Sequence, residues 1–483
     1  MTEAAQSAIV CDFNTASAGL TTRGAYRAIF VALGLACLTV WLFATSDLPW
    51  TSTRLWLAMA IVFVCALPVI AFAARPERWY LILPLVALAY MTAYGVPSFR
   101  AEPTKLVWAD PIPESDYIYT CGILALGCST LVVGMFMPVH RMITSSMWQW
   151  PSDDKLLAGR FAVAALIGGI VRVLNEATLV PEAVVQPALI IANMSEIGVF
   201  VVFALWTRKK ASPLWCFVAL AGILPTLFVG FGSSLLWNVV RPCLMFVVGY
   251  YGLKRRVPWV VLLVMFAFFV PANFAKHEFR YQLAEHPAGI FERPLLFAKV
   301  IWEGYTDDTM TFEDAGDSVT DRIDHLTLMA QVVSMTPEPI PYWEGETYKT
   351  LFYAPIPRFV MPDKPRKGLG QEFGHRYHFI SDEDYSTSVN FAQLVEAYAN
   401  FGPVGVGVGM FIIGLLYAII SALLERRDPP LVAVAVGSAI ALGALNIESD
   451  FALVNGGLVL ALPSLWVLMH VLCWNTATES GGV

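Results

Sequence analysis

Arginine, lysine and histidine side chains gather in one polar stretch of this chain, residues 274–401, which we call the polar block. It contains five of the seven histidines, and a proline-rich segment within it presents Arg358 and Lys364. Arg280 and Arg322 precede that segment. A planar guanidinium binds phosphate oxygens through paired hydrogen bonds and stays charged at every working pH. These residues therefore predict contacts to a pyrophosphate group, and stabilisation of pyrophosphate as a leaving group without a metal ion.

Further charged residues occur within apolar stretches, where charge is costly. Arg172, Arg241 and Glu196 each lie inside a predicted membrane span, and Glu448 and Asp450 lie at the end of another. An unpaired arginine at the centre of a span costs about 2.5–3.5 kcal/mol on insertion scales. One interpretation is a structural ion pair between an arginine and Glu196. The other is that Arg172 and Arg241 line an outward-facing cavity and bind an anionic substrate, which the cations of the polar block favour.

Histidine and carboxylate side chains provide candidates for a general base that takes the proton from an attacking sugar hydroxyl. His325 and Glu396 are the candidate catalytic residues, and His375 is a candidate substrate contact. A histidine without a catalytic role is the simpler alternative for His325 and His375. Glu396 and Asn400 share a helix face at a spacing of one turn, so they could instead cap and position that helix.

No metal or cofactor site is expected from the sequence. The eight cysteines are scattered, the polar block has none, and no Cys or His spacing is typical of zinc. Acidic pairs such as Asp307 and Asp308 are typical of a solvated face. The net charge of −7 gives no indication of a nucleic-acid partner.

The elements that must position these residues are membrane helices. The chain is 57% hydrophobic and 14% charged, with a mean hydropathy of +0.61. A span needs about 20 mostly apolar residues, and a helix satisfies its own backbone in lipid. Twelve spans are predicted, at residues 26–45, 55–73, 79–97, 117–138, 159–178, 184–206, 213–231, 234–252, 257–273, 402–424, 430–447 and 455–474. The predicted fold is an all-α polytopic membrane protein with about twelve transmembrane helices and a large, mostly helical loop region between the ninth and tenth.

The distribution of Lys and Arg between the loops predicts the orientation, because cytoplasmic loops are enriched in both. Alternate loops, starting with the N-terminal tail, contain most of the loop cations, whereas the other short loops contain only Arg54, Arg100 and Lys105. We therefore expect both termini in the cytoplasm and the polar block outside. The expected division of the chain is a cytoplasmic tail at 1–25, membrane helices 1–9 at 26–273, an extracytoplasmic loop region at 274–401, membrane helices 10–12 at 402–474, and a cytoplasmic tail at 475–483.

Helical periodicity predicts three helices within the polar block. Residues 294–302 are expected to form an amphipathic helix at the membrane interface. Residues 321–333 are expected to form a second helix, and residues 391–400, with Asn390 as a cap, a third. Gly402 and the proline after it mark the start of the next span.

The order of these features resembles a known family. A charged segment at 276–280 follows the ninth span, Arg322 comes next, and the Pro-Arg and Lys-Pro pairs lie within 348–365. Residues 396–402, with the pattern Glu-x-Tyr-x-Asn-Phe-Gly, then run into a glycine-rich span. Over residues 220–425 the chain resembles the Wzy-like O-antigen and exopolysaccharide repeat-unit polymerases of bacterial inner membranes.

The resemblance implies a metal-independent glycosyl transfer at the outer face of the inner membrane, with no cofactor. The growing glycan would move from undecaprenyl pyrophosphate to the terminal sugar of an incoming lipid-linked repeat unit. The implied partners are this lipid-linked oligosaccharide, membrane lipid and a chain-length regulator, and no nucleic acid. The resemblance assigns His325 or Glu396 to the acceptor side, and it assigns pyrophosphate and head-group contacts to Arg241, Arg280, Arg322, Arg358 and Lys364, with Arg172 and His375 as further substrate contacts.

Two other functions fit the same residues. A flippase or transporter for lipid-linked oligosaccharides would also bind pyrophosphate, but its cations would line a cavity open to both sides. An O-antigen-type ligase shares the donor and differs only in the acceptor. A membrane protease of the exosortase kind needs a cysteine at the outer face, which the polar block lacks. Glycosyltransferases that use polyprenyl-phosphate sugars have an acidic pair in the first outer loop, where this chain has only Asp47.

Overall fold

The structure is a computed structural model that describes residues 22–75, 81–100, 112–143, 155–233, 235–306, 324–353, 356, 360, 361, 363, 369–385, 387–424 and 430–474. All regular elements among these residues are helical. The α-helices are α2 (Thr22–Ala44), α3 (Thr53–Ala74), α4 (Ile82–Tyr90), α5 (Glu114–Met135), α6 (Lys155–Glu176), α7 (Val185–Ala192), α8 (Met194–Thr207), α9 (Pro213–Phe231), α10 (Trp237–Lys254), α11 (Trp259–Glu285), α12 (Arg293–Thr306), α14 (Leu326–Met335), α15 (Thr350–Tyr353), α16 (Gly370–Arg376), α17 (Gln393–Leu424), α18 (Leu431–Ala444) and α19 (Phe451–Leu472). The short turns are η1 (Met91–Gly95), η2 (Pro97–Phe99), η3 (Val139–Arg141), η5 (Glu182–Val184) and η6 (Glu346–Lys349).

Ten helical segments in the described part of the chain are long and apolar enough to cross a membrane. The expectation of an all-helical, multi-pass membrane protein is therefore confirmed. Two predicted spans fall short of these criteria. α18 has only 14 residues where 430–447 was expected, and α10 has 18 residues that include Arg241 and Pro242. The total of twelve transmembrane helices remains a prediction.

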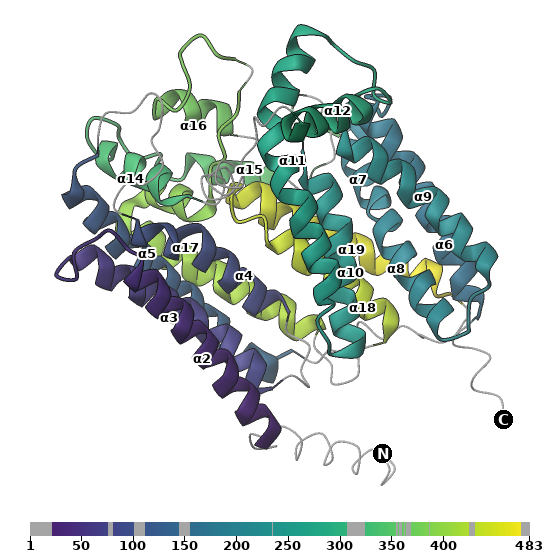
Figure 1. The fold of residues 1–483 in the computed structure, drawn as a ribbon, viewed down its shortest axis with the longest axis horizontal. Helices are drawn as coiled ribbons and strands as arrows, with labels where there is room; N and C mark the ends of the chain where they lie inside the picture. Colours follow the sequence, from purple (N-terminus) through teal and green to yellow (C-terminus); the bar gives the residue numbers. More distant parts are fainter. Residues whose placement is uncertain are drawn as a thin grey trace.

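Figure 1 shows two groups of spans, with α2, α3, α4, α5 and α17 on the left and α6, α7, α8 and α9 on the right. α17 packs along α5, and α6 packs against α8 and α9. Gly134 of α5 and Gly414 of α17 bring their helices close, because a Cβ on either residue would overlap the other helix's backbone. α18 contacts α4 from the left group, α8 from the right group, and also α10 and α19. It therefore connects the two groups.

α17 consists of two helices joined at a kink. Phe401 (φ −142°, ψ 18°) and Gly402 (φ 60°, ψ −148°) leave helical geometry. Glycine tolerates this positive φ, and a Cβ at Gly402 would lie only 2.6 Å from the Tyr342 hydroxyl. The boundary predicted at Gly402 is confirmed, so residues 393–400 form a separate short helix on the side of the polar block.

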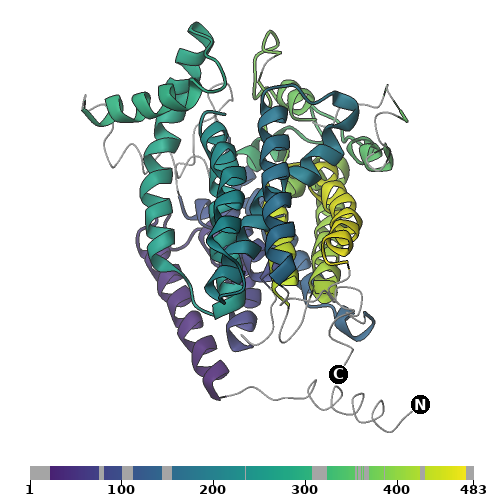
Figure 2. The same cartoon turned by 90° about the vertical axis from the view of Figure 1, so that its right-hand side faces the viewer.

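The described helices of the polar block lie toward the upper end in Figures 1 and 2, with α14 and α16 on the left of Figure 1, α15 between, and α12 on the right above α9. α12 confirms the helix predicted at 294–302, and α14 overlaps the one predicted at 321–333. α11 continues to Glu285, past the expected end of its span at 273. The predicted cap by Asn390 is wrong, because α17 begins at Gln393 and the Asn390 amide instead donates to Glu448 Oε2 at 2.9 Å.

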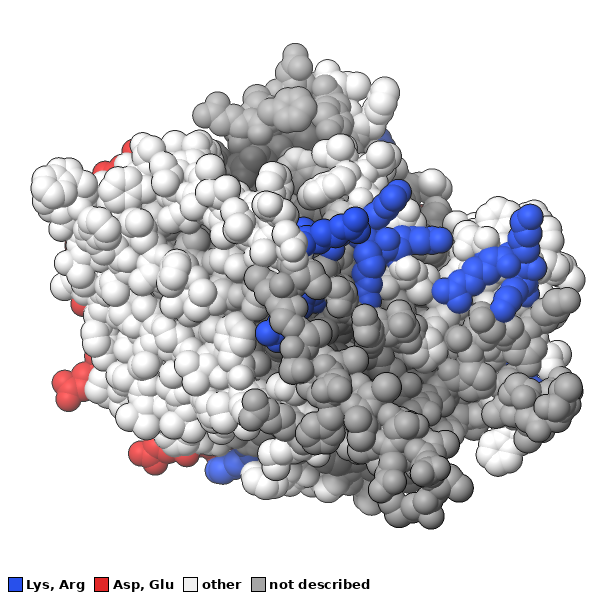
Figure 3. All heavy atoms as spheres, turned by 90° about the horizontal axis from the view of Figure 1, so that it is seen from below, with Lys and Arg blue, Asp and Glu red and all other residues white. Residues whose placement is uncertain are grey.

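The opposite end of the molecule is rich in cations. α11 runs toward the polar block, so its start at Trp259 and the preceding residues Lys254 and Arg255 lie at the far end. Figure 3, a view from below, shows Lys and Arg side chains gathered on this face, with visible Asp and Glu only toward its left edge. Described Lys and Arg side chains therefore gather at the end of the molecule opposite the polar block.

Candidate functional site

Three charged side chains from α6, α8 and α10 meet between the helices. Arg172 Nη2 lies 3.6 Å from Glu196 Oε1, and Arg241 Nη1 lies 3.3 Å from the same oxygen. Arg241 Nη1 also donates to Asn193 Oδ1 at 2.9 Å, at the break between α7 and α8. The Glu196 side chain is 2% exposed, and those of Arg172 and Arg241 are 14% and 16% exposed. We call these three charged residues the arginine cluster. The predicted ion pair is present, and two arginines share it.

The arginine cluster has more hydrogen-bond donors than its contacts use. A guanidinium has five N–H donors. Among the described residues, Arg241 bonds only through Nη1, and the buried Nε of Arg172 has no hydrogen-bond partner. Glu176, one turn farther along α6, accepts from Asn238 at 3.4 Å. The unused donors can therefore bind a further anion that has several oxygen atoms.

Both arginines lie at the helix ends that face the polar block. Arg172 is in the last turns of α6, and Arg241 is in the first turns of α10. α10 ends at the cation-rich face, so its beginning lies toward the polar block. Both arginines therefore lie nearer to the polar-block ends of their helices than to the cation-rich face.

His325 lies where the polar block meets the membrane helices. Its backbone N–H donates to Ala93 O at 3.1 Å, and its ring lies 6.0 Å from that of Tyr94 in an edge-on arrangement. Both partners belong to η1, a π-helical turn of the kind often found at functional sites. Nε2 lies 4.0 Å from Glu448 Oε1, while Glu448 Oε2 accepts from Asn390. A fixed carboxylate beside a buried imidazole can orient the ring.

Glu396 has different surroundings. It is fully buried, its Oε2 accepts from the Phe451 N–H at 2.6 Å, and Oε1 has no hydrogen-bond partner among the described residues. One turn later, Asn400 accepts from the Gly345 N–H at 2.8 Å and donates to Thr347 Oγ1 at 2.9 Å. The two side chains thus connect the start of α17 with the first residue of α19 and with the loop before η6. This geometry agrees with the positioning alternative.

Two tyrosines anchor the polar block as neutral groups. Burial raises the pKa of Tyr348, whose ring stacks 6.4 Å from that of Phe401. Burial also raises the pKa of Tyr377, whose hydroxyl lies 3.0 Å from Thr336 Oγ1. Both hydroxyls therefore stay protonated at working pH, and packing and hydrogen bonds hold these segments in place.

The other predicted site residues are dispersed. Arg280 is exposed on the polar-block end of α11. His375 is half-buried on α16, and its Nε2 has no hydrogen-bond partner in the described part of the chain. No group of three or more His, Cys, Asp or Glu that could hold a metal ion occurs within the described ranges. Three predicted residues lie outside those ranges: Arg322, Arg358 and Lys364.

Sequence reasoning gave no role to several residues of these clusters. Asn193 lies inside a predicted continuous span, and a lone asparagine in an apolar stretch was the only available signal. Glu448 was expected only to lie at the end of a span, and its approach to His325 joins distant parts of the sequence. Tyr94 depends on a π-helical turn, which has no reliable sequence signature.

Comparisons with known proteins identify a family without assigning an activity. A family model described as a domain of unknown function, DUF8712, matches residues 89–428. This range includes the arginine cluster, His325, Glu396 and Asn400, but not Glu448 or Phe451. No curated protein and no solved structure matches the chain.

Proposed function

The chain belongs to the DUF8712 family, and we propose that it is a repeat-unit polymerase of bacterial surface polysaccharide synthesis, a metal-independent glycosyltransferase of the inner membrane. It would transfer a growing glycan from undecaprenyl pyrophosphate to a lipid-linked repeat unit. One observation carries the proposal: two largely buried arginines share a single carboxylate and leave most of their N–H donors unused by the described residues.

A lipid pyrophosphate fits the arginine cluster for two reasons. Its oxygens can accept hydrogen bonds from both guanidinium groups, and its prenyl chain can stay in the bilayer while the head group enters between the helices. The position of Arg172 and Arg241 at the polar-block ends of α6 and α10 favours access from one side only. That favours an outward-facing enzyme over a transporter whose cations line a path to both sides.

In the proposed reaction, a sugar hydroxyl of the acceptor attacks the anomeric carbon of the donor. The bond from that carbon to the pyrophosphate oxygen breaks, and its electron pair leaves with undecaprenyl pyrophosphate. Arg172 and Arg241 stabilise the charge that develops on the leaving group. His325 accepts the hydroxyl proton, and Glu448 orients its imidazole. Glu396 serves as a positioning residue, and further contacts to the lipid-linked substrates are assigned to Arg280, Arg322, Arg358, Lys364 and His375.

The charge distribution supports the orientation that this reaction requires. Cations gather at the end opposite the polar block, and cytoplasmic loops are enriched in Lys and Arg. On this basis both termini are cytoplasmic and the polar block faces the periplasm, where lipid-linked repeat units are polymerised. α18 supports a common site, because it packs against α4, which leads into η1 beside His325, and against α8 and α10 of the arginine cluster.

The proposal is tested by deleting the gene and complementing it with variants while surface and lipid-linked glycans are resolved on gels. Arg172→Gln and Arg241→Gln should each lower polymer formation by about 10²–10³-fold, the usual effect of removing one donor that stabilises developing charge. Arg160→Gln is the matched control on α6, because among the described residues Arg160 donates to the backbone oxygens of Leu472 and Trp474 and lies apart from the arginine cluster. Normal long chains in both cluster variants, at normal protein levels, would refute the assignment.

The same gels separate the other functions. A polymerase deletion leaves single repeat units displayed outside, whereas loss of a flippase traps them on the cytoplasmic face. Loss of a ligase leaves long polymer on the lipid carrier. An unchanged glycan pattern would show that lipid-linked surface glycans are not the substrate of this protein.

The base assignment has its own test with the purified protein and lipid-linked substrates. His325→Gln should lower turnover by about 10²-fold or more while donor binding stays unchanged, because general-base catalysis contributes 10²–10⁴-fold. Glu448→Gln should give a smaller loss, since Glu448 acts by orienting the imidazole. Unchanged turnover in His325→Gln would move the base to another residue.

A further inference from the structure

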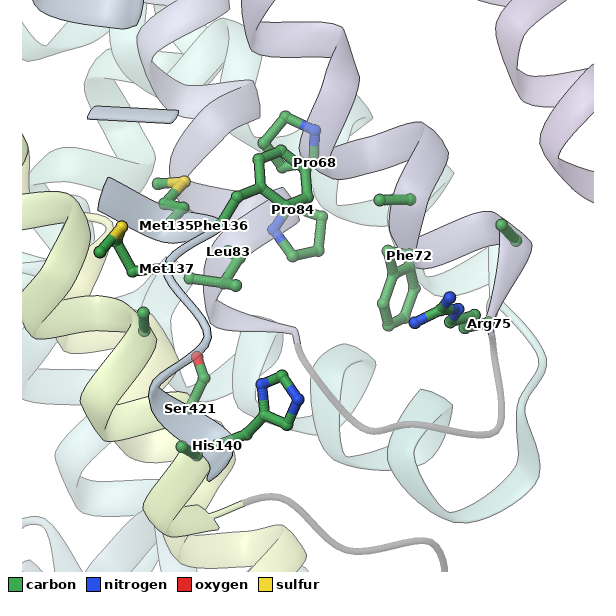
Figure 4. Close-up of a pocket in the computed structure, with 14 residues that line it drawn as sticks. Pro68, Phe72, Arg75, Leu83, Pro84, Met135, Phe136, Met137, His140 and Ser421 are labelled. Carbon is green, nitrogen blue, oxygen red and sulfur yellow. The ribbon is translucent and has the colours of Figure 1, made fainter. Parts of the chain in front are cut away.

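A cavity lies at the end of the bundle opposite the polar block. It encloses about 480 Å³ between the ends of α3, α5 and α17 and the start of α4, and η3 borders it (Figure 4). α17 begins at the polar block with Gln393, so its lining residues Ala418, Ser421 and Ala422 lie at the far end. The cavity is thus separate from both the arginine cluster and His325.

The lining is apolar with a few polar groups. In Figure 4, Pro68, Pro84 and Phe136 close the upper side, while Arg75 lies on the right and Ser421 and His140 at the lower left. Ligand pockets typically enclose about 300–1,000 Å³ and combine apolar walls with a small number of polar groups. The cavity has both properties, so it is large enough to take a substantial apolar ligand.

Two polar groups indicate the chemistry of that ligand. The Arg75 side chain follows the last turn of α3 and is exposed. Ser421 is 3% exposed, and its Oγ has no hydrogen-bond partner among the described residues, which is unfavourable for a buried hydroxyl unless a ligand or water bonds to it. A ligand with an apolar tail and an anionic head fits the apolar walls and Arg75, while the Ser421 hydroxyl needs a hydrogen bond from water or from a polar atom of the ligand.

We propose that this cavity binds the tail of an anionic phospholipid from the membrane leaflet opposite the polar block, with the lipid phosphate against Arg75. The choice of an anionic lipid is supported by the Lys and Arg side chains that gather at the same end of the molecule as the cavity. Basic groups at a membrane surface attract anionic head groups. A zwitterionic lipid offers the same tail but no net charge for this face.

The lipid would add contacts between α17 and the pair α3 and α4, which touch α17 directly at few residues and otherwise pack with it through α5. Its tail contacts α3 and α4 on one side and α17 on the other. α17 also carries Glu396 and the kink at Gly402, so occupancy stabilises the arrangement on which the polar block rests. This lipid site is independent of the proposed transfer reaction.

The test uses the full chain in nanodiscs of phosphatidylethanolamine, doped with phosphatidylglycerol or phosphatidylcholine that carries a photoreactive group at the acyl terminus. After illumination, cross-linked peptides are mapped by mass spectrometry. Phosphatidylglycerol should label peptides that line the cavity about fivefold more than phosphatidylcholine, the effect expected of one basic residue near the phosphate.

Two variants, each with its own control, test the contacts of the lipid tail and of the lipid head group separately. Ala71→Trp fills the cavity and should reduce labelling of the lining peptides to background, whereas Ala60→Trp, at an exposed position of the same helix, should not. Arg75→Gln should equalise the two lipids, whereas Lys254→Gln, on the same face but outside the lining, should leave the preference intact. Arg75 is exposed, so this variant tests the proposal even where Ala71→Trp fails to fold.

Three results would overturn the proposal. They are equal labelling of lining peptides in Ala71→Trp and the wild type, no preference for phosphatidylglycerol in the wild type, and displacement of the probe by inorganic phosphate alone. The last result would identify a site for free phosphate in place of a lipid.

Discussion

Two glutamates, Glu196 and Glu396, are buried in helices of this protein, and their neighbours give them opposite properties. Glu196 lies between two guanidinium groups that have donors to spare. Glu396 has no cation among its hydrogen-bond partners and accepts instead from the backbone N–H of Phe451, at the start of α19. The first is part of a site that can accept another anion. The second joins two helices.

The comparison shows that residue type alone does not identify a functional carboxylate. Both glutamates occur in apolar surroundings where an ionised group is expensive. The neighbouring groups determine what each carboxylate does. Two arginines form a site where an added anion can take the place of the carboxylate, whereas a bond from a helix N-terminus holds the carboxylate in one position. Experiments that supply a replacement anion therefore distinguish the two residues.

The largest effect is expected from Glu196→Ala. Removing one partner of a buried ion pair costs about 3–5 kcal/mol, here because Arg172 and Arg241 would repel each other. Added inorganic pyrophosphate should restore much of this stability, since a ligand at 100 times its Kd contributes about 2.7 kcal/mol. The measurement is the thermal unfolding midpoint of the purified protein with and without pyrophosphate. A destabilised variant that pyrophosphate leaves unchanged would show that the arginine cluster is purely structural.

Glu396→Ala should have a smaller effect that no added anion reverses. It leaves the buried Phe451 N–H without an acceptor, which costs about 1–3 kcal/mol. Pyrophosphate should not shift its unfolding midpoint more than that of the wild type. Glu396→Gln keeps an oxygen acceptor, and we expect near-normal turnover and stability. Abolished turnover in Glu396→Gln with an unchanged midpoint would make Glu396 catalytic and would end the contrast with Glu196.

The smallest effect is expected at the kink that separates Glu396 from the membrane part of α17. Gly402→Ala forces a side chain into positive φ and against Tyr342, at a cost of about 1–2 kcal/mol. Gly407→Ala is the matched control, because a Cβ there meets nothing within 4 Å and the residue is helical. Equal unfolding midpoints for the two variants would show that the kink does not depend on glycine.

The sequence predicted the membrane helices well, because long apolar runs leave few alternatives in lipid. It also predicted the break at Gly402, since glycine followed by proline disfavours a continuous helix. The sequence overestimated the length of α18, because the expected range 430–447 includes a polar connection. It also placed the end of α11 too early, at 273, because polar residues continue that helix beyond the apolar run.

The candidate site was predictable only in part. Arg172, Glu196 and Arg241 stood out because charge within a span is rare, and their convergence follows from that cost. The approach of Glu448 to His325 was not predictable, since it depends on how α14 meets the connection between α18 and α19. The hydrogen bond from Phe451 to Glu396 depends on the same long-range packing.

The shortness of α18 has a consequence for the bilayer. Its 14 residues span about 21 Å at 1.5 Å per residue, against about 30 Å of hydrocarbon in a typical bilayer. A helix this short matches only a locally thinned membrane, or else its connection to α19 lies below the lipid surface. In either case Glu448 and Asp450 mark a depression where water and polar head groups reach deeper than they do around the longer helices. The glycosyl transfer that we propose would use such a place, because the acceptor hydroxyl must stay hydrated while the prenyl tail stays in the hydrocarbon.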